Sequence, residues 1–154
     1  MAFLVPVTAQ EAPKKGVMLP PAVVSMFEQI NAFRAENGLT PVKFSSRLVR
    51  AAASHSEDQA TRGYFGHDSP DPKRADAWTR AELYGYDWAE VCENIFRSNQ
   101  TEDEKIVQET LEAWKDSGAH RANLLSPKVT DIGIGIARYP SGESVVTMMM
   151  GREF

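Results

Sequence analysis

The chain has 154 residues, of which 42% are hydrophobic and 25% charged, and its formal net charge is −4. This length predicts one domain with a proper core, and the acidic balance argues against nucleic acid as a partner, because phosphate binding needs a basic surface. No apolar run approaches the roughly 20 residues that a membrane-spanning helix needs. A single cysteine, Cys92, excludes an internal disulfide, so cysteine usage does not identify the compartment.

The N-terminal segment separates from the rest of the chain by composition. Residues 1–20 contain several prolines and little periodic pattern, which is typical of a tail or linker. Residues 2–7 are apolar, and Ala9 ends a string that suits signal-peptidase cleavage, but no basic residue precedes this short run. Two interpretations stay open, a signal-peptide remnant and a plain tail. The folded domain is expected over residues 21–154.

Two helices are predicted next. After Pro20, apolar residues recur at three- and four-residue steps, which predicts a helix that ends at Gly38. A second helix is predicted over residues 46–62, with Ser45 as its N-cap and Gly63 at its end.

Helices and strands alternate in the second half. Residues 73–84 predict a short helix and residues 89–97 a strand. A helix is predicted over residues 101–116, because the threonine and glutamate at its start have the spacing of a capping box. A short helical piece is expected around residues 120–125.

The C-terminal segment predicts a β-hairpin. Residues 132–137 alternate isoleucine with glycine or alanine, residues 139–142 have turn chemistry, and residues 144–150 form the partner strand. These elements together predict an α+β domain in which helices cover an antiparallel sheet.

Three strings in the sequence carry a family resemblance: YFGH at Tyr64–His67, ENI at Glu93–Ile95 and WKDSGAHRANLL at Trp114–Leu125. Together they resemble the CAP superfamily of cysteine-rich secretory, antigen 5 and pathogenesis-related proteins, also called SCP domains. The resemblance covers about residues 22–154. It is nearest to the bacterial, disulfide-free branch, because animal and plant members are typically stapled by several disulfides.

The resemblance implies a fold and a cellular location. The implied fold is an α-β-α sandwich with a three- or four-stranded antiparallel sheet, and the implied location is secreted or periplasmic. It also implies that His67, His120 and Glu93 converge in one cleft. The family places a second glutamate two or three residues after the tryptophan, but this chain has Asp116 and Ser117 there.

Each candidate residue also has a structural interpretation. His67 lies in a loop, where histidines are often plain surface residues. His120 is placed to cap the preceding helix, since cations suit helix C-termini. Glu93 lies within an apolar strand, where a carboxylate is costly unless it is paired or faces a wet cleft. An ion pair with Arg74 or Arg121 would explain Glu93 without a functional role.

Three neighbouring residues are expected to be structural. Strand alternation turns Asn94 and Cys92 away from Glu93, which predicts a hydrogen-bonding role for Asn94 and an inert, buried thiol for Cys92. His55 shares the inward stripe of the second helix with Leu48, so we expect a core histidine.

Two functions from different classes follow, beside a third alternative in which the polar residues of the cleft only stabilise the fold. One is a non-catalytic binding module for a small apolar ligand such as a lipid or sterol, or for a partner protein, with aromatic residues including Trp78 beside the cleft. The other is a metal-assisted hydrolase in which His67 and His120 hold zinc and Glu93 activates water. Catalytic zinc usually has three protein ligands, and Glu93 is a possible third metal ligand beside His67 and His120, or a base on a bound water. Because this ligand count is marginal, we expect weak, pH-dependent binding of zinc or another divalent cation, and a monomeric protein.

Overall fold

The computed structural model describes residues 19–154, so the signal-peptide question, which concerns residues 1–9, lies outside the described residues. The elements run in the order α1 (Pro21–Glu36), β1 (Lys43–Phe44), α2 (Ser46–Arg62), η1 (Pro72–Arg74), α3 (Ala77–Leu83), β2 (Trp88–Ser98), α4 (Asp103–Asp116), α5 (Gly118–Leu124), β3 (Asp131–Arg138) and β4 (Ser144–Glu153).

A four-stranded sheet in the order β1-β3-β4-β2 forms the centre of the fold. The three long strands are antiparallel, as predicted, and the hairpin β3–β4 turns at a glycine, Gly142, with a positive φ of 93°. The two-residue strand β1 pairs with β3 in parallel, so the sheet is mixed. Among residues 19–154, the long strand β2 pairs with β4 alone and forms one edge of the sheet.

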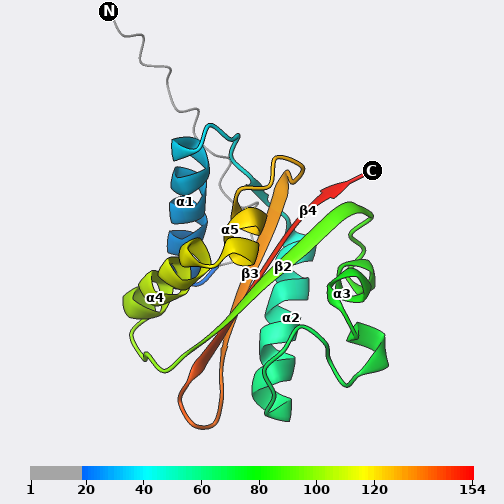
Figure 1. The fold of residues 1–154 in the computed structure, drawn as a ribbon. Helices are drawn as coiled ribbons and strands as arrows, with labels where there is room; N and C mark the ends of the chain where they lie inside the picture. Colours follow the sequence, from blue (N-terminus) through cyan, green and yellow to red (C-terminus); the bar gives the residue numbers. More distant parts are fainter. Residues whose placement is uncertain (1–18) are drawn as a thin grey trace, which may run out of the picture.

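Helices cover both faces of the sheet and complete the predicted α-β-α sandwich. Figure 1 shows α1, α4 and α5 together on one side, and α2 with α3 on the other. The side chains of β4 alternate between these layers. Met148 and Met150 pack in the core under α1, α4 and α5, whereas Met149 packs against α2 and α3. All three are fully buried in the packing on the two faces of the sheet.

Helix α2 lies directly on strand β3 because two glycines leave room for its backbone. A Cβ on Gly133 would come within 2.1 Å of the carbonyl carbon of Leu48, and one on Gly135 within 2.3 Å of the Cα of Ala53. Atoms of the backbone cannot move aside cheaply, so glycine is required at both positions. This close approach places His55 of α2 deep under the sheet.

The predicted boundaries of α1 and α2 hold at the residues that signal them. Ser45 caps α2 by accepting a hydrogen bond from the amide of Leu48, and Gly63 ends the helix with a φ of 73°. The predicted helix over residues 73–84 is shorter. Asp76 caps it by accepting a bond from the amide of Thr79, and the preceding residues form the turn η1.

The predicted capping box at Thr101 was wrong. Helix α4 begins at Asp103, and its first bond runs from the amide of Ile106 to the carbonyl of Glu102. The carbonyl of Thr101 instead accepts a hydrogen bond from the Arg138 guanidinium at 2.9 Å, which keeps this residue in the loop. Within residues 19–154, no helix is both long enough and apolar enough to cross a bilayer.

Candidate functional site

The candidate site lies at the edge strand β2, whose alternation separates Glu93 from Asn94. Glu93 lies opposite Met149 and therefore faces the layer of α2 and α3. Asn94 lies opposite Met148 and faces the layer of α4 and α5. The strand thus sends one polar side chain to each face of the sheet.

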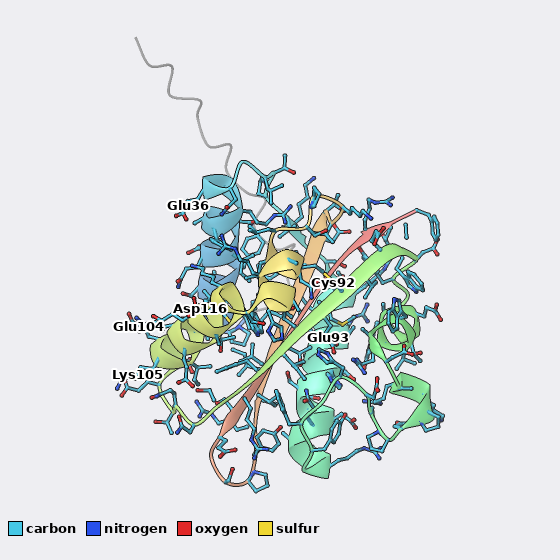
Figure 2. The ribbon with its side chains drawn as sticks, in the orientation of Figure 1. Glu36, Cys92, Glu93, Glu104, Lys105 and Asp116 are labelled. Carbon is cyan, nitrogen blue, oxygen red and sulfur yellow. The ribbon has the colours of Figure 1, made fainter. Side chains whose placement is uncertain are left out.

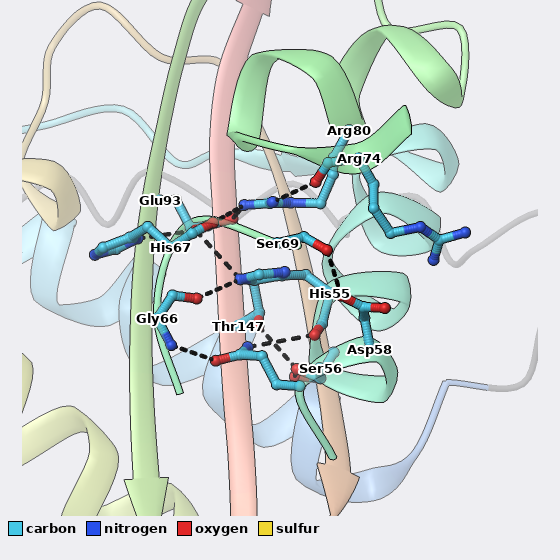
Figure 3. Close-up of polar contacts among 12 residues, drawn as sticks. His55, Ser56, Asp58, Gly66, His67, Ser69, Arg74, Arg80, Glu93 and Thr147 are labelled. Atoms are coloured by element: carbon cyan, nitrogen blue, oxygen red, sulfur yellow. Dashed lines mark hydrogen bonds and ion pairs between the residues drawn. The ribbon is translucent and has the colours of Figure 1, made fainter. Parts of the chain in front are cut away.

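The Glu93 carboxylate is buried and hydrogen-bonded to two partners. Its Oε1 accepts a hydrogen bond from Nδ1 of His67 at 2.9 Å, and its Oε2 accepts one from Nη2 of Arg80 at 2.7 Å. The side chain of Glu93 is 3% exposed and that of Arg80 is fully buried, whereas His67 is 55% exposed. Figure 3 shows the three groups in a line, with Glu93 between the imidazole and the guanidinium.

Arg80 is a site residue that the sequence did not reveal. Of the two suggested partners of Glu93, Arg74 instead pairs with Asp71, and Arg121 stacks over the ring of Phe33. The signal for Arg80 was indirect: a carboxylate predicted in an apolar strand requires a nearby cation. Which of several arginines supplies it depends on how α3 packs against β2.

His55 lies beneath this pair and is the core histidine that its helical stripe predicted. Its Nε2 is 2.8 Å from the carbonyl of Gly66 and 3.9 Å from Oε1 of Glu93. Burial lowers the pKa of His55, so the ring is neutral near pH 7. Since a carbonyl only accepts, the neutral ring carries its proton on Nε2.

The loop that carries His67 is fixed to α2 by buried polar groups. The hydroxyls of Tyr64 and Ser69 both donate to the Asp58 carboxylate, and these bonds hold the pKa of Asp58 below its usual value against the effect of burial. Gln59 accepts a hydrogen bond from the amide of Gly66 at 3.1 Å. The loop around His67 therefore has a defined backbone.

His120 approaches from α5, on the other side of the edge strand. Its Nδ1 lies 2.9 Å from Oγ of Ser117, and its carbonyl accepts a hydrogen bond from the Asn94 amide at 3.0 Å. Asn94 is thus the structural hydrogen-bonding residue that strand alternation predicted. Burial lowers the pKa of His120, and a positive charge on His67 lowers it further.

The direct contacts tie His67 to Glu93 but do not include His120. The hydrogen bond that His67 donates to Glu93 raises the pKa of this histidine. Within residues 19–154, no group of three or more histidine, cysteine, aspartate or glutamate side chains is arranged to hold a metal ion. Ser117 rather than Asp116 contacts His120, and Figure 2 shows Asp116 at the end of α4, away from Glu93.

A cavity of about 230 Å³ opens beside His67 on the α3 side of β2. Its apolar wall includes Ala77, Val91 and Trp78, whose ring is about half exposed. Cys92 also borders it and is half-buried rather than buried as predicted, although burial raises the pKa of its thiol to about 12.

Comparison with known proteins adds sequence relatives. A family model for the cysteine-rich secretory protein family, CAP, matches residues 27–150. The protein YkwD of Bacillus subtilis is 31% identical over 120 residues, which are 75% of this chain and 44% of that protein. The chain thus spans less than half the length of this curated relative.

Solved structures with the same fold extend over most of the chain. An outer surface protein of Borrelia burgdorferi has a TM-score of 0.77 at 12% identity, with 90% of this chain and 97% of that chain covered. An extracellular SCP-domain protein of Bacillus anthracis has a TM-score of 0.73 at 22% identity, covering 90% and 45%. NaASP2, crystallised with Zn²⁺, has a TM-score of 0.63 at 15% identity, covering 92% and 84%.

The family match, the α-β-α sandwich and the single cysteine agree with one another. The chain belongs to the cysteine-rich secretory protein (CAP) family, as a member without an internal disulfide.

Proposed function

We propose that this chain is a secreted, non-catalytic binding module. In this proposal His67 and His120 bind a divalent cation weakly, and the cavity beside Trp78 takes a small apolar ligand such as a lipid or sterol. The extracellular SCP-domain relative supports the location. The observation that carries the proposal is the pair of hydrogen bonds that the Glu93 carboxylate accepts from His67 and Arg80.

Both carboxylate oxygens of Glu93 already accept a hydrogen bond. One carboxylate oxygen bonds to His67 and the other to the buried guanidinium of Arg80. A general base must be within reach of the water it deprotonates and free to accept a proton. A carboxylate locked between two donors is better suited to hold its neighbours in position than to activate water, so the hydrolase is the weaker candidate.

The donor set fits a weak cation site. Each histidine uses Nδ1 for a protein hydrogen bond, His67 with Glu93 and His120 with Ser117, which leaves Nε2 of both rings for a metal. Metal-binding histidines commonly bond a carboxylate through the other ring nitrogen, as His67 does. Two imidazole ligands are fewer than catalytic zinc usually has. The zinc-containing crystals of NaASP2 support this choice of metal.

The cavity supplies the apolar half of the proposed site. Ala77, Val91 and the exposed indole of Trp78 would contact a hydrocarbon or ring system, while His67 borders the same space. A cation, when bound, would supply positive charge for a polar or anionic end of the ligand. An amphipathic molecule of modest size therefore fits best.

Zinc titration by calorimetry near neutral pH tests the proposal. We expect weak binding by the wild type and its loss in both His67→Ala and His120→Ala. Asp116→Asn is the matched control, because Asp116 is exposed and stands where the family has a second glutamate; its affinity should stay at the wild-type value. Unchanged affinity in either histidine variant would refute the proposed site. Peptide hydrolysis that disappears in Glu93→Gln would favour the hydrolase.

A further inference from the structure

The ring of His67 makes one hydrogen bond to the described residues. The imidazole is 55% exposed, and Nδ1 donates this hydrogen bond to Glu93. An exposed ring with one hydrogen bond can point in a fixed direction only if its partner is itself fixed. The direction of the His67 ring therefore depends on what holds Glu93.

Arg80 fixes both the ring's partner and the backbone of His67. Its Nη2 donates to Oε2 of Glu93 at 2.7 Å and to the carbonyl of His67 at 2.9 Å, while Nη1 donates to the carbonyl of Arg74 at 2.9 Å. The guanidinium is planar, permanently charged and fully buried, so these bonds share one rigid frame. Figure 3 shows the imidazole of His67 extending from Glu93 on the side away from Arg80.

We propose that Arg80 is the positioning residue of the His67 site. A carboxylate beside a guanidinium only accepts hydrogen bonds, so the nitrogen of His67 that faces it carries the proton. The neutral ring is then the Nδ1–H tautomer, and Nε2 presents a lone pair to a ligand. Arg80 determines this tautomer indirectly, because it holds the Glu93 carboxylate to which Nδ1 of His67 is bonded. The consequence for metal binding rests on the proposed function, but the tautomer does not.

The protein contains its own reference for this tautomer. Nε2 of His55 donates to the carbonyl of Gly66, so the neutral ring of His55 is the opposite tautomer, Nε2–H. Long-range ¹H–¹⁵N correlation spectra distinguish the two tautomers by the shifts of the ring nitrogens. One spectrum of the ¹⁵N-labelled protein thus contains both patterns.

The experiment compares wild type, Arg80→Met, Arg80→Lys and the control Arg74→Met at a pH where His67 is neutral. Arg74 lies in the neighbouring turn η1, where its side chain donates a hydrogen bond to Ser54 and forms an ion pair with Asp71. We expect Nδ1–H for His67 in wild type and in R74M, loss of that pattern in R80M, and its return in R80K, which keeps a cation beside Glu93. Zinc affinity should fall about tenfold or more in R80M, as for other residues that support a metal ligand.

Two outcomes would overturn the proposal. One is an R80M protein that is folded by circular dichroism and retains the wild-type pattern of His67. The other is Nε2–H for His67 in the wild type, which needs no variant and remains decisive if R80M fails to fold. If the wild type shows the expected tautomer and loses it in R80M but binds no zinc, the positioning role stands and the proposed function fails.

Discussion

Glu93 and Arg80 are both buried in this fold, and each makes the burial of the other tolerable. Removing one partner of such a pair typically costs about 3–5 kcal/mol, because the other charge is left uncompensated. The buried pair is also connected to the surface, because Glu93 contacts the half-exposed ring of His67. At the scale of single residues, the site is therefore a buried ion pair of Glu93 and Arg80 that is bonded to one solvent-exposed histidine, His67.

The histidines give the stability of the metal-free protein opposite pH dependences. The pKa of His67 is raised above its usual value of 6.5 by Glu93, so its stabilising contribution is complete below about pH 6.5 and is lost as pH rises through the folded-state pKa. We expect His67→Ala to lose more unfolding free energy at pH 5.5 than at pH 8.5, by about a few tenths of a kcal/mol because the ring is exposed. Urea unfolding with a chelator present measures this.

His120→Ala is the control of opposite sign. The pKa of His120 is lowered by burial and by His67, so protonation on acidification favours the unfolded wild type. The free energy of unfolding of His120→Ala, taken relative to that of the wild type, should therefore be higher at pH 5.5 than at pH 8.5. The same sign of change in both variants would show that the assigned environments of the two rings are wrong.

Among the contacts between elements, that of α2 with β3 leaves the least space for a side chain. We expect Gly135→Ala to destabilise the protein by about 2–4 kcal/mol, because the new methyl group would meet the backbone of Ala53 and one of the two must shift. Gly118→Ala, at a position with open space around it, should stay within about 0.5 kcal/mol of wild type. Equal effects of the two substitutions in thermal or urea unfolding would contradict this packing.

The elements that could be predicted are those with local chemistry at their ends. Helix α2 has a serine that caps it and a glycine that ends it, and both act as the sequence indicates. Helix α4 was placed two residues too early, because the carbonyl of Thr101 bonds to Arg138 of the hairpin, a tertiary contact that no local pattern contains. The parallel pairing of the short strand β1 was missed for the same reason.

The arrangement of the whole molecule decides what meets at the site. The sequence singled out His67, Glu93 and His120, and the structure puts His67 and Glu93 in contact, with His120 across the edge strand on α5. Arg80 could not be predicted, because its burial follows from the packing of α3 against β2. The central claim is that the two histidines share one cation while Glu93 stays with Arg80.

The measurement that tests this claim most directly is a crystal structure of the wild type with zinc, with the anomalous signal of the ion used to locate it. We predict one ion bound by Nε2 of His67 and Nε2 of His120, completed by water, with Glu93 still bonded to Arg80 and to Nδ1 of His67. An ion bound directly by the Glu93 carboxylate, with Arg80 displaced, would contradict the account and favour a catalytic centre.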